Sequence, residues 1–282
     1  MIIDDEFKEI SFDAFEQYRA ANKEADFIVV DVRQEREYAA GHVPGAKLIP
    51  LNTLGNHLSE LALDKDLFFY CHSGARSEVA GIMAAESGRD AQKTYNITGG
   101  FLSYQGHSLE GFPRLQVFDY QESDDRLLYQ AMELEKAAER FYESLLSFAP
   151  DENFIAPLEQ LSKAEIAHAR TIYSYWKKSV ENPVPFEELY GSLKGDILEN
   201  GRPLSDVMTD LYANKKVTWT DVIEMALSIE IQAYDLYRTM ADRRGQGEPQ
   251  DAFLSIAQME KSHMKLVAKM LGDQGKRIKI FA

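Results

Sequence analysis

The chain has 282 residues, of which 45% are hydrophobic and 27% charged, a composition typical of globular, water-soluble proteins with room for two domains. Its formal net charge of −15 argues against nucleic acid and anionic membrane surfaces as partners. No apolar run approaches the roughly 18 residues that span a bilayer, and the acidic N-terminus lacks the pattern of a signal peptide, so we expect a cytoplasmic protein.

The first part of the chain alternates short apolar runs with helical patterns. Residues 27–30 and 67–70 are short, apolar and rich in β-branched or aromatic side chains, which predicts two buried strands. Ser11 is suited to cap a helix over residues 12–21, and a second helix is predicted over residues 76–87. Strands that alternate with helices favour a parallel α/β sheet.

The pattern changes after a stretch with two glycines and a proline, residues 106–113. We therefore divide the chain into a first domain, residues 1–118, and a second domain, residues 119–282. Apolar periodicity in the second domain predicts long helices at residues 121–149, 151–180, 218–244 and 248–271. The long connection between the second and third of them, residues 183–217, contains a short helical pattern at 203–213. This arrangement predicts an all-α four-helix bundle with one crossover.

The second domain contains an internal repeat with an offset of 95 residues. The inward stripe of each predicted helix is apolar except where Glu, His or Tyr interrupts it, and the interruptions match. The first and third helices carry Glu135 and Tyr142, and Glu230 and Tyr237. The second and fourth carry Glu165 and His168, and Glu260 and His263. A register held over four segments indicates a duplicated helix pair.

The interrupting Glu and His residues predict a metal site. Glu165 and His168 are three residues apart, so they share a helix face, as do Glu260 and His263. An unpaired buried carboxylate costs about 3–5 kcal/mol, and four at one level would also repel each other. Two divalent cations would neutralise them. A single exposed Glu-x-x-His pair is common, but the duplicated set with Glu135 and Glu230 favours metal binding.

Tyr142 and Tyr237 each lie seven residues after an inward glutamate, and therefore on the same helix face. They either donate hydrogen bonds to the ligand carboxylates or serve as core aromatics. The sequence leaves both alternatives open.

Residues 120–272 resemble the rubrerythrin branch of the ferritin-like proteins along all four helices. The resemblance implies a di-iron centre that reacts with peroxide or dioxygen, with six ligands: Glu135, Glu165, His168, Glu230, Glu260 and His263. Glu and His also suit manganese, so the metal is left open. Rubrerythrins usually carry a Cys-x-x-Cys domain that delivers electrons. This chain has one cysteine, so we expect an external electron donor.

That cysteine, Cys71, lies where a predicted strand turns into a predicted helix. A lone cysteine is ordinarily a small buried hydrophobe. Here the strand–loop–helix turn presents backbone N–H groups that stabilise an anion and lower the thiol pKa. Gly74 permits the tight backbone, and Arg76 is placed to hold the oxyanion of a sulfur donor. The sequence therefore predicts a reactive thiolate.

Residues 7–114 resemble the rhodanese family, on the loop 71–77 and the segments 31–38, 41–46, 99–101 and 111–113. The resemblance implies that Cys71 accepts a sulfane sulfur as a persulfide and passes it on. Related phosphatases have a loop longer by one residue, so the spacing favours sulfur chemistry. Asp31 either fixes the loop or is a strand-end turn residue, and Arg36 either binds an anion or is a solvated charge.

These expectations combine into one functional hypothesis. The chain is predicted to be an enzyme that joins sulfane-sulfur transfer to non-haem di-iron redox chemistry, with thiosulfate, a polysulfide or a persulfide as donor. The alternative is a non-catalytic sensor or carrier that binds sulfur and iron. Because ferritin-like bundles often pair, we expect a homodimer.

Overall fold

The computed structural model describes residues 7–88, 90, 93–119, 121–147, 149–150, 152–213, 217–244 and 247–273. The chain forms two compact units that divide between Phe112 and Pro113. The division lies a few residues before the predicted boundary at residue 118.

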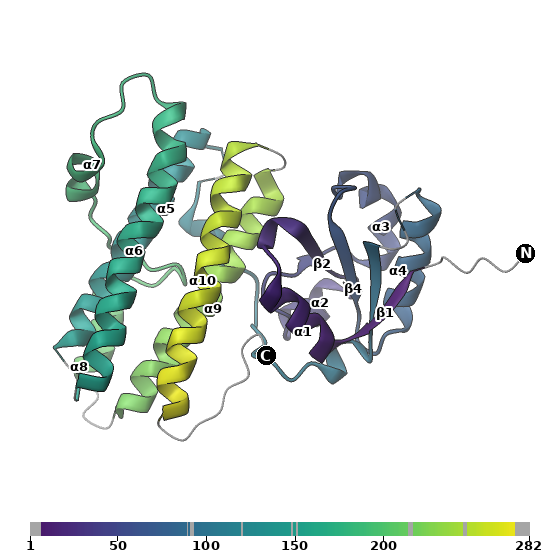
Figure 1. Cartoon of the computed structure of the whole chain (residues 1–282), viewed down its shortest axis with the longest axis horizontal. Helices are drawn as coiled ribbons and strands as arrows, with labels where there is room; N and C mark the ends of the chain where they lie inside the picture. The colour runs from purple at the N-terminus through teal and green to yellow at the C-terminus, as the bar shows by residue number, and fades with distance from the viewer. Residues whose placement is uncertain are drawn as a thin grey trace, which may run out of the picture. The chain divides into compact units, whose positions relative to one another are not determined.

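The first unit contains a five-stranded, fully parallel sheet with the strand order β1-β5-β4-β2-β3 (Figure 1). The strands are β1 (Lys8–Ser11), β2 (Phe27–Asp31), β3 (Lys47–Leu48), β4 (Asp66–Tyr70) and β5 (Thr94–Thr98). The predicted parallel α/β class is confirmed, and the two predicted strands correspond to β2 and β4. The other three escape prediction because they are short or partly polar.

Helices cover both faces of this sheet because successive strand residues point to opposite sides. The helices are α1 (Phe12–Ala21), α2 (Glu35–Ala39), α3 (Leu51–His57) and α4 (Ala75–Glu86). Phe27, Val29 and Phe68 pack with α1, whereas Ile28, Val30 and Phe69 pack with α3 and α4. Ser11 caps α1 as predicted, since its side chain accepts a hydrogen bond from the amide of Ala14.

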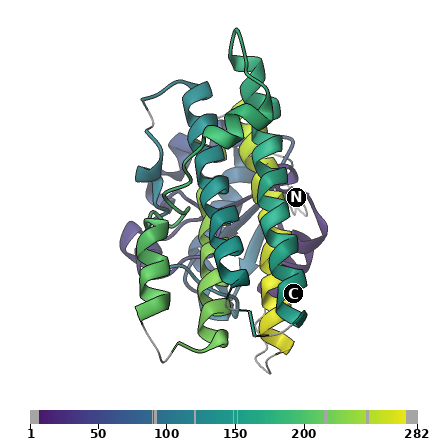
Figure 2. The same cartoon turned by 90° about the vertical axis from the view of Figure 1, so that its left-hand side faces the viewer.

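The second unit contains the predicted long helices: α5 (Asp124–Leu146), α6 (Glu152–Ser179), α9 (Trp219–Arg244) and α10 (Glu248–Asp273). Helix α5 packs against α6, α9 against α10, and α6 against α10, as Figures 1 and 2 show. The crossover between α6 and α9 carries α7 (Phe186–Ser192) and α8 (Leu204–Ala213), and α8 matches the helical pattern at 203–213. Among the described residues, no helix combines the length and apolar content needed to cross a membrane.

Candidate functional sites

The first site is built at the carboxyl end of the sheet, where Cys71 directly follows the central strand β4 and precedes α4. The backbone turns sharply at Gly74, whose φ of 107° is in the left-handed region that favours glycine. This turn aims the amide of Gly74 at Cys71 Sγ, at 3.1 Å. The Ser77 hydroxyl lies 3.6 Å from the same sulfur. The thiol is 1% exposed and faces donors from its own loop.

These donors change the acidity of the thiol. Burial by itself raises the pKa of Cys71, because it disfavours the charged form. Hydrogen bonds from the Ser77 hydroxyl and from the amides of Ser77, Ser73 and Gly74 outweigh burial, so the pKa of the thiol lies below its ordinary value. The direction of this shift agrees with the prediction from the sequence, and the thiolate is the nucleophilic form of cysteine.

A second loop supports the cysteine loop from the end of the neighbouring strand β5. The amide of Phe101 donates to the Cys71 carbonyl at 2.7 Å, and the amide of Leu102 donates to the His72 carbonyl at 3.0 Å. Gly100 makes this approach possible, because a Cβ there would lie 2.5 Å from the Cys71 carbonyl oxygen. The loop after β5 therefore fixes the backbone that carries the thiol.

We expect Gly100→Ala to destabilise the first unit by about 2–4 kcal/mol, of which about 1 kcal/mol is left-handed strain and the rest a clash with the cysteine loop. Gly111→Ala is a matched control, since Gly111 also has a positive φ, but a Cβ added there would meet no heavy atom within 4 Å. The measurement is the urea midpoint for alkylation of Cys71, the single thiol. Equal midpoints for the two variants would contradict the close-approach argument.

Asp31, at the end of β2, forms a buried ion pair with Arg33. It is fully buried, and both its oxygens accept from the Arg33 side chain, the closest contact being 2.7 Å from Nη2. The guanidinium also donates to the Gly41 carbonyl at 2.7 Å and lies 4.2 Å from the ring centre of Phe101. Through Arg33, Asp31 is linked to Phe101 of the loop that supports the cysteine loop, and Asp31 also pairs with Tyr70, the residue before Cys71.

Arg76 lies in the first turn of α4, where its guanidinium forms a two-point ion pair with Glu37 of α2, at 2.6 and 2.7 Å. Glu37 is the main cause that raises the pKa of Arg76, and the nearby Cys71 contributes in the same direction. Arg76 in turn lowers the pKa of Glu37 to about 2. The other arginine singled out from the sequence, Arg36, is exposed on α2.

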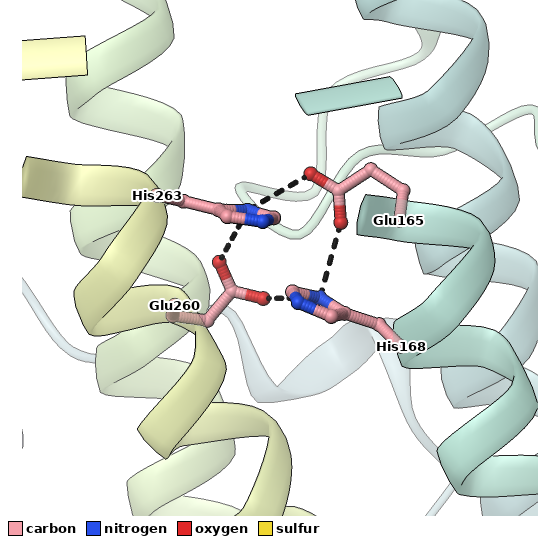
Figure 3. Close-up of side chains that lie close together, drawn as sticks. All are labelled: Glu165, His168, Glu260 and His263. Carbon is pink, nitrogen blue, oxygen red and sulfur yellow. Dashed lines mark ion pairs between the residues drawn. The ribbon is translucent and has the colours of Figure 1, made fainter. Parts of the chain in front are cut away.

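The second site lies inside the bundle, where all six predicted ligands are buried. In Figure 3, Glu165 and His168 from α6 point toward Glu260 and His263 from α10. Their ligand atoms lie within 4.8 Å of one another. Glu135 of α5 and Glu230 of α9 complete the cluster: Glu135 lies 3.0 Å from His168 Nδ1, and Glu230 lies 3.3 Å from His263 Nδ1.

The contacts of this cluster follow the internal repeat. His168 contacts Glu135, Glu165 and Glu260, while His263 contacts Glu230, Glu260 and Glu165. Exchanging the two halves of the 95-residue repeat converts the first set into the second, because Glu165 and Glu260 change places. The two imidazole rings stack with their centres 4.5 Å apart. The duplicated sequence therefore produces a cluster with approximate two-fold symmetry.

Two buried tyrosines bind the ligand carboxylates across the bundle. The Tyr142 hydroxyl of α5 donates to Glu230 of α9, and the Tyr237 hydroxyl of α9 donates to Glu135 of α5. The hydrogen bonds favour the first of the two alternatives left open by the sequence. Each tyrosine orients a carboxylate that its own helix does not supply.

The charges in the cluster suit cations. Despite burial, the surrounding carboxylates raise the pKa of His168 and of His263 well above the ordinary value. The same imidazoles hold the pKa of Glu165 below its usual range. The Nδ1 atom of His263 makes no hydrogen bond of normal geometry among the described residues. Carboxylate oxygens and imidazole nitrogens at this spacing fit two divalent transition-metal ions.

A cavity of about 230 Å³ leads from the surface to both histidines, between α6 and α10. Its walls are mostly apolar. They consist of Gln160, Leu161, Ala164, Ala167, His168, Met259, Ser262, His263 and Leu266. A small molecule with little charge can reach the ligand histidines by this route.

Two residues of these sites were given no role from the sequence. Ser77 lies at the end of the loop 71–77, and the sequence assigned it no role, although its hydroxyl lies 3.6 Å from the sulfur. Glu37 pairs with Arg76 across 39 positions, a contact that local patterns do not reveal. Glu199, a buried carboxylate of the crossover, was also not singled out, because it lies outside the 95-residue repeat.

Comparisons with known proteins find both domain families that the sequence resembles. The rhodanese-like domain family matches residues 14–107, and the rubrerythrin family matches residues 221–281. The chain is 34% identical over 84 residues to a sulfurtransferase of Allochromatium vinosum, an alignment that covers 30% of this chain and 77% of the relative. It is 35% identical over 91 residues to the uncharacterized protein YqhL of Bacillus subtilis, covering 32% and 69%.

A rhodanese-like domain protein of Staphylococcus aureus, known from its crystal structure, is 29% identical with a TM-score of 0.32. The match covers 34% of this chain and 90% of that one.

Proposed function

This chain belongs to the rhodanese-like family, and a rubrerythrin domain follows the rhodanese-like domain in the sequence. We propose that the chain joins sulfane-sulfur transfer on Cys71 to peroxide or dioxygen reduction at two iron ions. The observation that carries the proposal is the pairing of two complete sites in one chain. One is a thiol held among donors at a strand–helix turn. The other is a buried set of four carboxylates and two imidazoles.

The sulfur half of the proposal uses groups of the cysteine loop. The Cys71 thiolate attacks the outer sulfur of thiosulfate, the S–S bond of the donor breaks, and sulfite leaves while Cys71 becomes a persulfide. The Gly74 amide and the Ser77 hydroxyl stabilise the negative sulfur before and after this step. An acceptor thiolate then takes the outer sulfur and regenerates the Cys71 thiolate.

The metal half of the proposal uses the bundle cluster. Glu135, Glu165, His168, Glu230, Glu260 and His263 would hold the two ions, and iron would supply the two electrons that, with two protons, reduce hydrogen peroxide to water. Tyr142 and Tyr237 hold two of the carboxylates in place. The apolar cavity admits a small neutral oxidant to the two histidines. An external donor or a persulfide would return the electrons.

The test is peroxide consumption by the iron-loaded chain, with thiosulfate, a persulfide or an external reductase as the electron source. The proposal expects multiple turnovers with at least one of these sources. Binding of sulfur and iron without turnover would instead support a sensor or carrier. The single cysteine is the observation that supports this sensor or carrier function. With one cysteine the chain has no Cys-x-x-Cys site to pass electrons to the metal ions.

Glu37 should limit the use of anionic donors, since it neutralises Arg76 beside the thiol. We expect Glu37→Gln to lower the KM for thiosulfate about three- to tenfold, because the freed guanidinium attracts the dianion by about 1 kcal/mol more. Glu35→Gln is the matched control, since Glu35 is exposed on the same helix. A higher KM in the Glu37 variant would mean that Glu37 instead orients Arg76 for donor binding.

A further inference from the structure

Glu199 is a buried carboxylate that neither half of the proposed function uses. Its side chain belongs to the crossover between α7 and α8 and is 3% exposed. Its Oε2 atom has no hydrogen-bond partner among the described residues. Leaving such an oxygen buried without a partner costs about 1–3 kcal/mol, and more when it is charged. A bound cation or a proton on this oxygen would remove that cost.

The crossover before Glu199 is fixed against α5 at the level of the metal cluster. The amides of Lys194 and Gly195 donate to Glu133 of α5, at 2.9 and 2.8 Å. Arg140, two turns further along α5, donates to the carbonyls of the same two residues. Helix α5 is approached so closely that a Cβ on Gly195 would lie 2.8 Å from the amide nitrogen of Ala137.

These contacts bracket Glu135, the ligand that α5 supplies. Beyond the fixed segment, a turn closed by hydrogen bonds from Leu198 to Arg202 and from Gly201 to Leu198 holds Glu199 in the interior. Burial raises the pKa of Glu199 well above its usual value, and Glu135 contributes most among the neighbouring charges. Glu199 also contributes to the raised pKa of Tyr237, the donor to Glu135.

Glu199 breaks the symmetry of the cluster. The six repeated ligands offer the two ions equivalent surroundings, with four carboxylates balancing two divalent charges. The crossover occurs once and contributes one further carboxylate on the Glu135 side. The additional negative charge should therefore favour a cation at one of the two positions.

Building on the proposed function, we propose that Glu199 is a seventh protein ligand, which binds the metal ion nearest Glu135 and makes the two metal positions inequivalent. The ion on the Glu230 side depends on the repeated ligands alone. Position 199 thereby sets the order in which the two ions bind.

The test is an anaerobic titration of the metal-free full-length chain with Co(II), followed by the visible absorption of the bound ion. The wild-type chain is expected to bind two ions in two resolved steps. Glu199→Gln should weaken the tighter step at least tenfold and leave the weaker one unchanged. Glu199→Asp, which keeps the charge on a shorter side chain, should fall between the two. Thermal melting of the metal-free variants checks the fold, and glutamine should not lower stability much because the Oε2 atom that it replaces has no hydrogen-bond partner among the described residues.

Glu139→Gln is the matched control. Glu139 is also a buried carboxylate of the bundle, one turn after Glu135, but it already accepts hydrogen bonds from Lys136 and Tyr190. Its loss should leave both Co(II) steps unchanged. Equal weakening in the two variants, or equal weakening of both steps in Glu199→Gln, would overturn the ligand assignment. Failure of the wild-type chain to bind two ions would instead refute the proposed metal centre.

Discussion

Cys71→Ser is expected to abolish sulfur transfer from thiosulfate to cyanide while leaving the metal content of the bundle unchanged. Cys71 is the single thiol, so no other side chain can form the persulfide. A serine hydroxyl stays protonated near neutral pH and makes no stable bond to sulfane sulfur, so the loss should be at least about a thousandfold. The proposed metal ligands all belong to the second unit, so iron per chain should match the wild type.

Ser73→Ala is the control for this experiment. Ser73 is exposed in the same loop, and its contribution to the thiol comes from the backbone amide, which alanine retains. The variant should keep most of the wild-type activity. Measurable transfer in Cys71→Ser at more than about one hundredth of the wild-type rate would remove Cys71 from the proposed mechanism. Loss of iron in that variant would mean that the two units depend on each other.

The sequence predicts a fold element well where one segment carries the whole signal. β2 and β4 are central strands buried on both faces, so their composition alone marks them. β3 has two residues, and β1 and β5 are partly exposed or polar, so their strand identity arises from pairing with neighbours. The long helices were predicted to within a few residues because apolar periodicity persists through each of them.

The same distinction applies to the sites. The buried Glu and His cluster of the bundle could be predicted because a repeat placed the same residue types at matching helical positions. The carboxylates that bind Tyr142 and Tyr237 lie on another helix, and the sequence left that role open. Glu37 meets Arg76 through a contact between distant segments, and we propose that Glu199 reaches the cluster from the crossover in the same way. Such contacts depend on how helices and loops pack, which no local pattern reports.

Metal binding to the bundle is expected to release at least two protons per chain near neutral pH. In the metal-free chain the carboxylates raise the pKa of His168 and of His263 well above 6.5, so both imidazoles are protonated at pH 7. An imidazole must lose a proton to bind a metal. The apparent affinity should therefore rise with pH by about tenfold per ion per pH unit, from 6.5 up to the raised pKa values.

The same protons affect folding with the opposite sign. A pKa that is higher in the folded than in the unfolded chain stabilises the metal-free fold below the unfolded pKa of about 6.5, and this stability is lost as pH rises through the folded value. Alkaline pH should thus weaken the metal-free bundle while strengthening metal binding. Calorimetry of Co(II) binding in buffers with different ionisation enthalpies counts the released protons.

Replacing one histidine of the cluster tests whether the protons released on metal binding come from His168 and His263. His168→Gln should lower the count by about one, because one imidazolium is missing. His57→Gln is the control, since His57 is about half exposed in the first unit and should not change the count. If binding heats do not depend on the buffer, or if affinity is flat between pH 6.5 and 8, the two imidazoles are not displaced by metal. The duplicated Glu-x-x-His pairs would then form a structural ion-pair network in place of a metal centre.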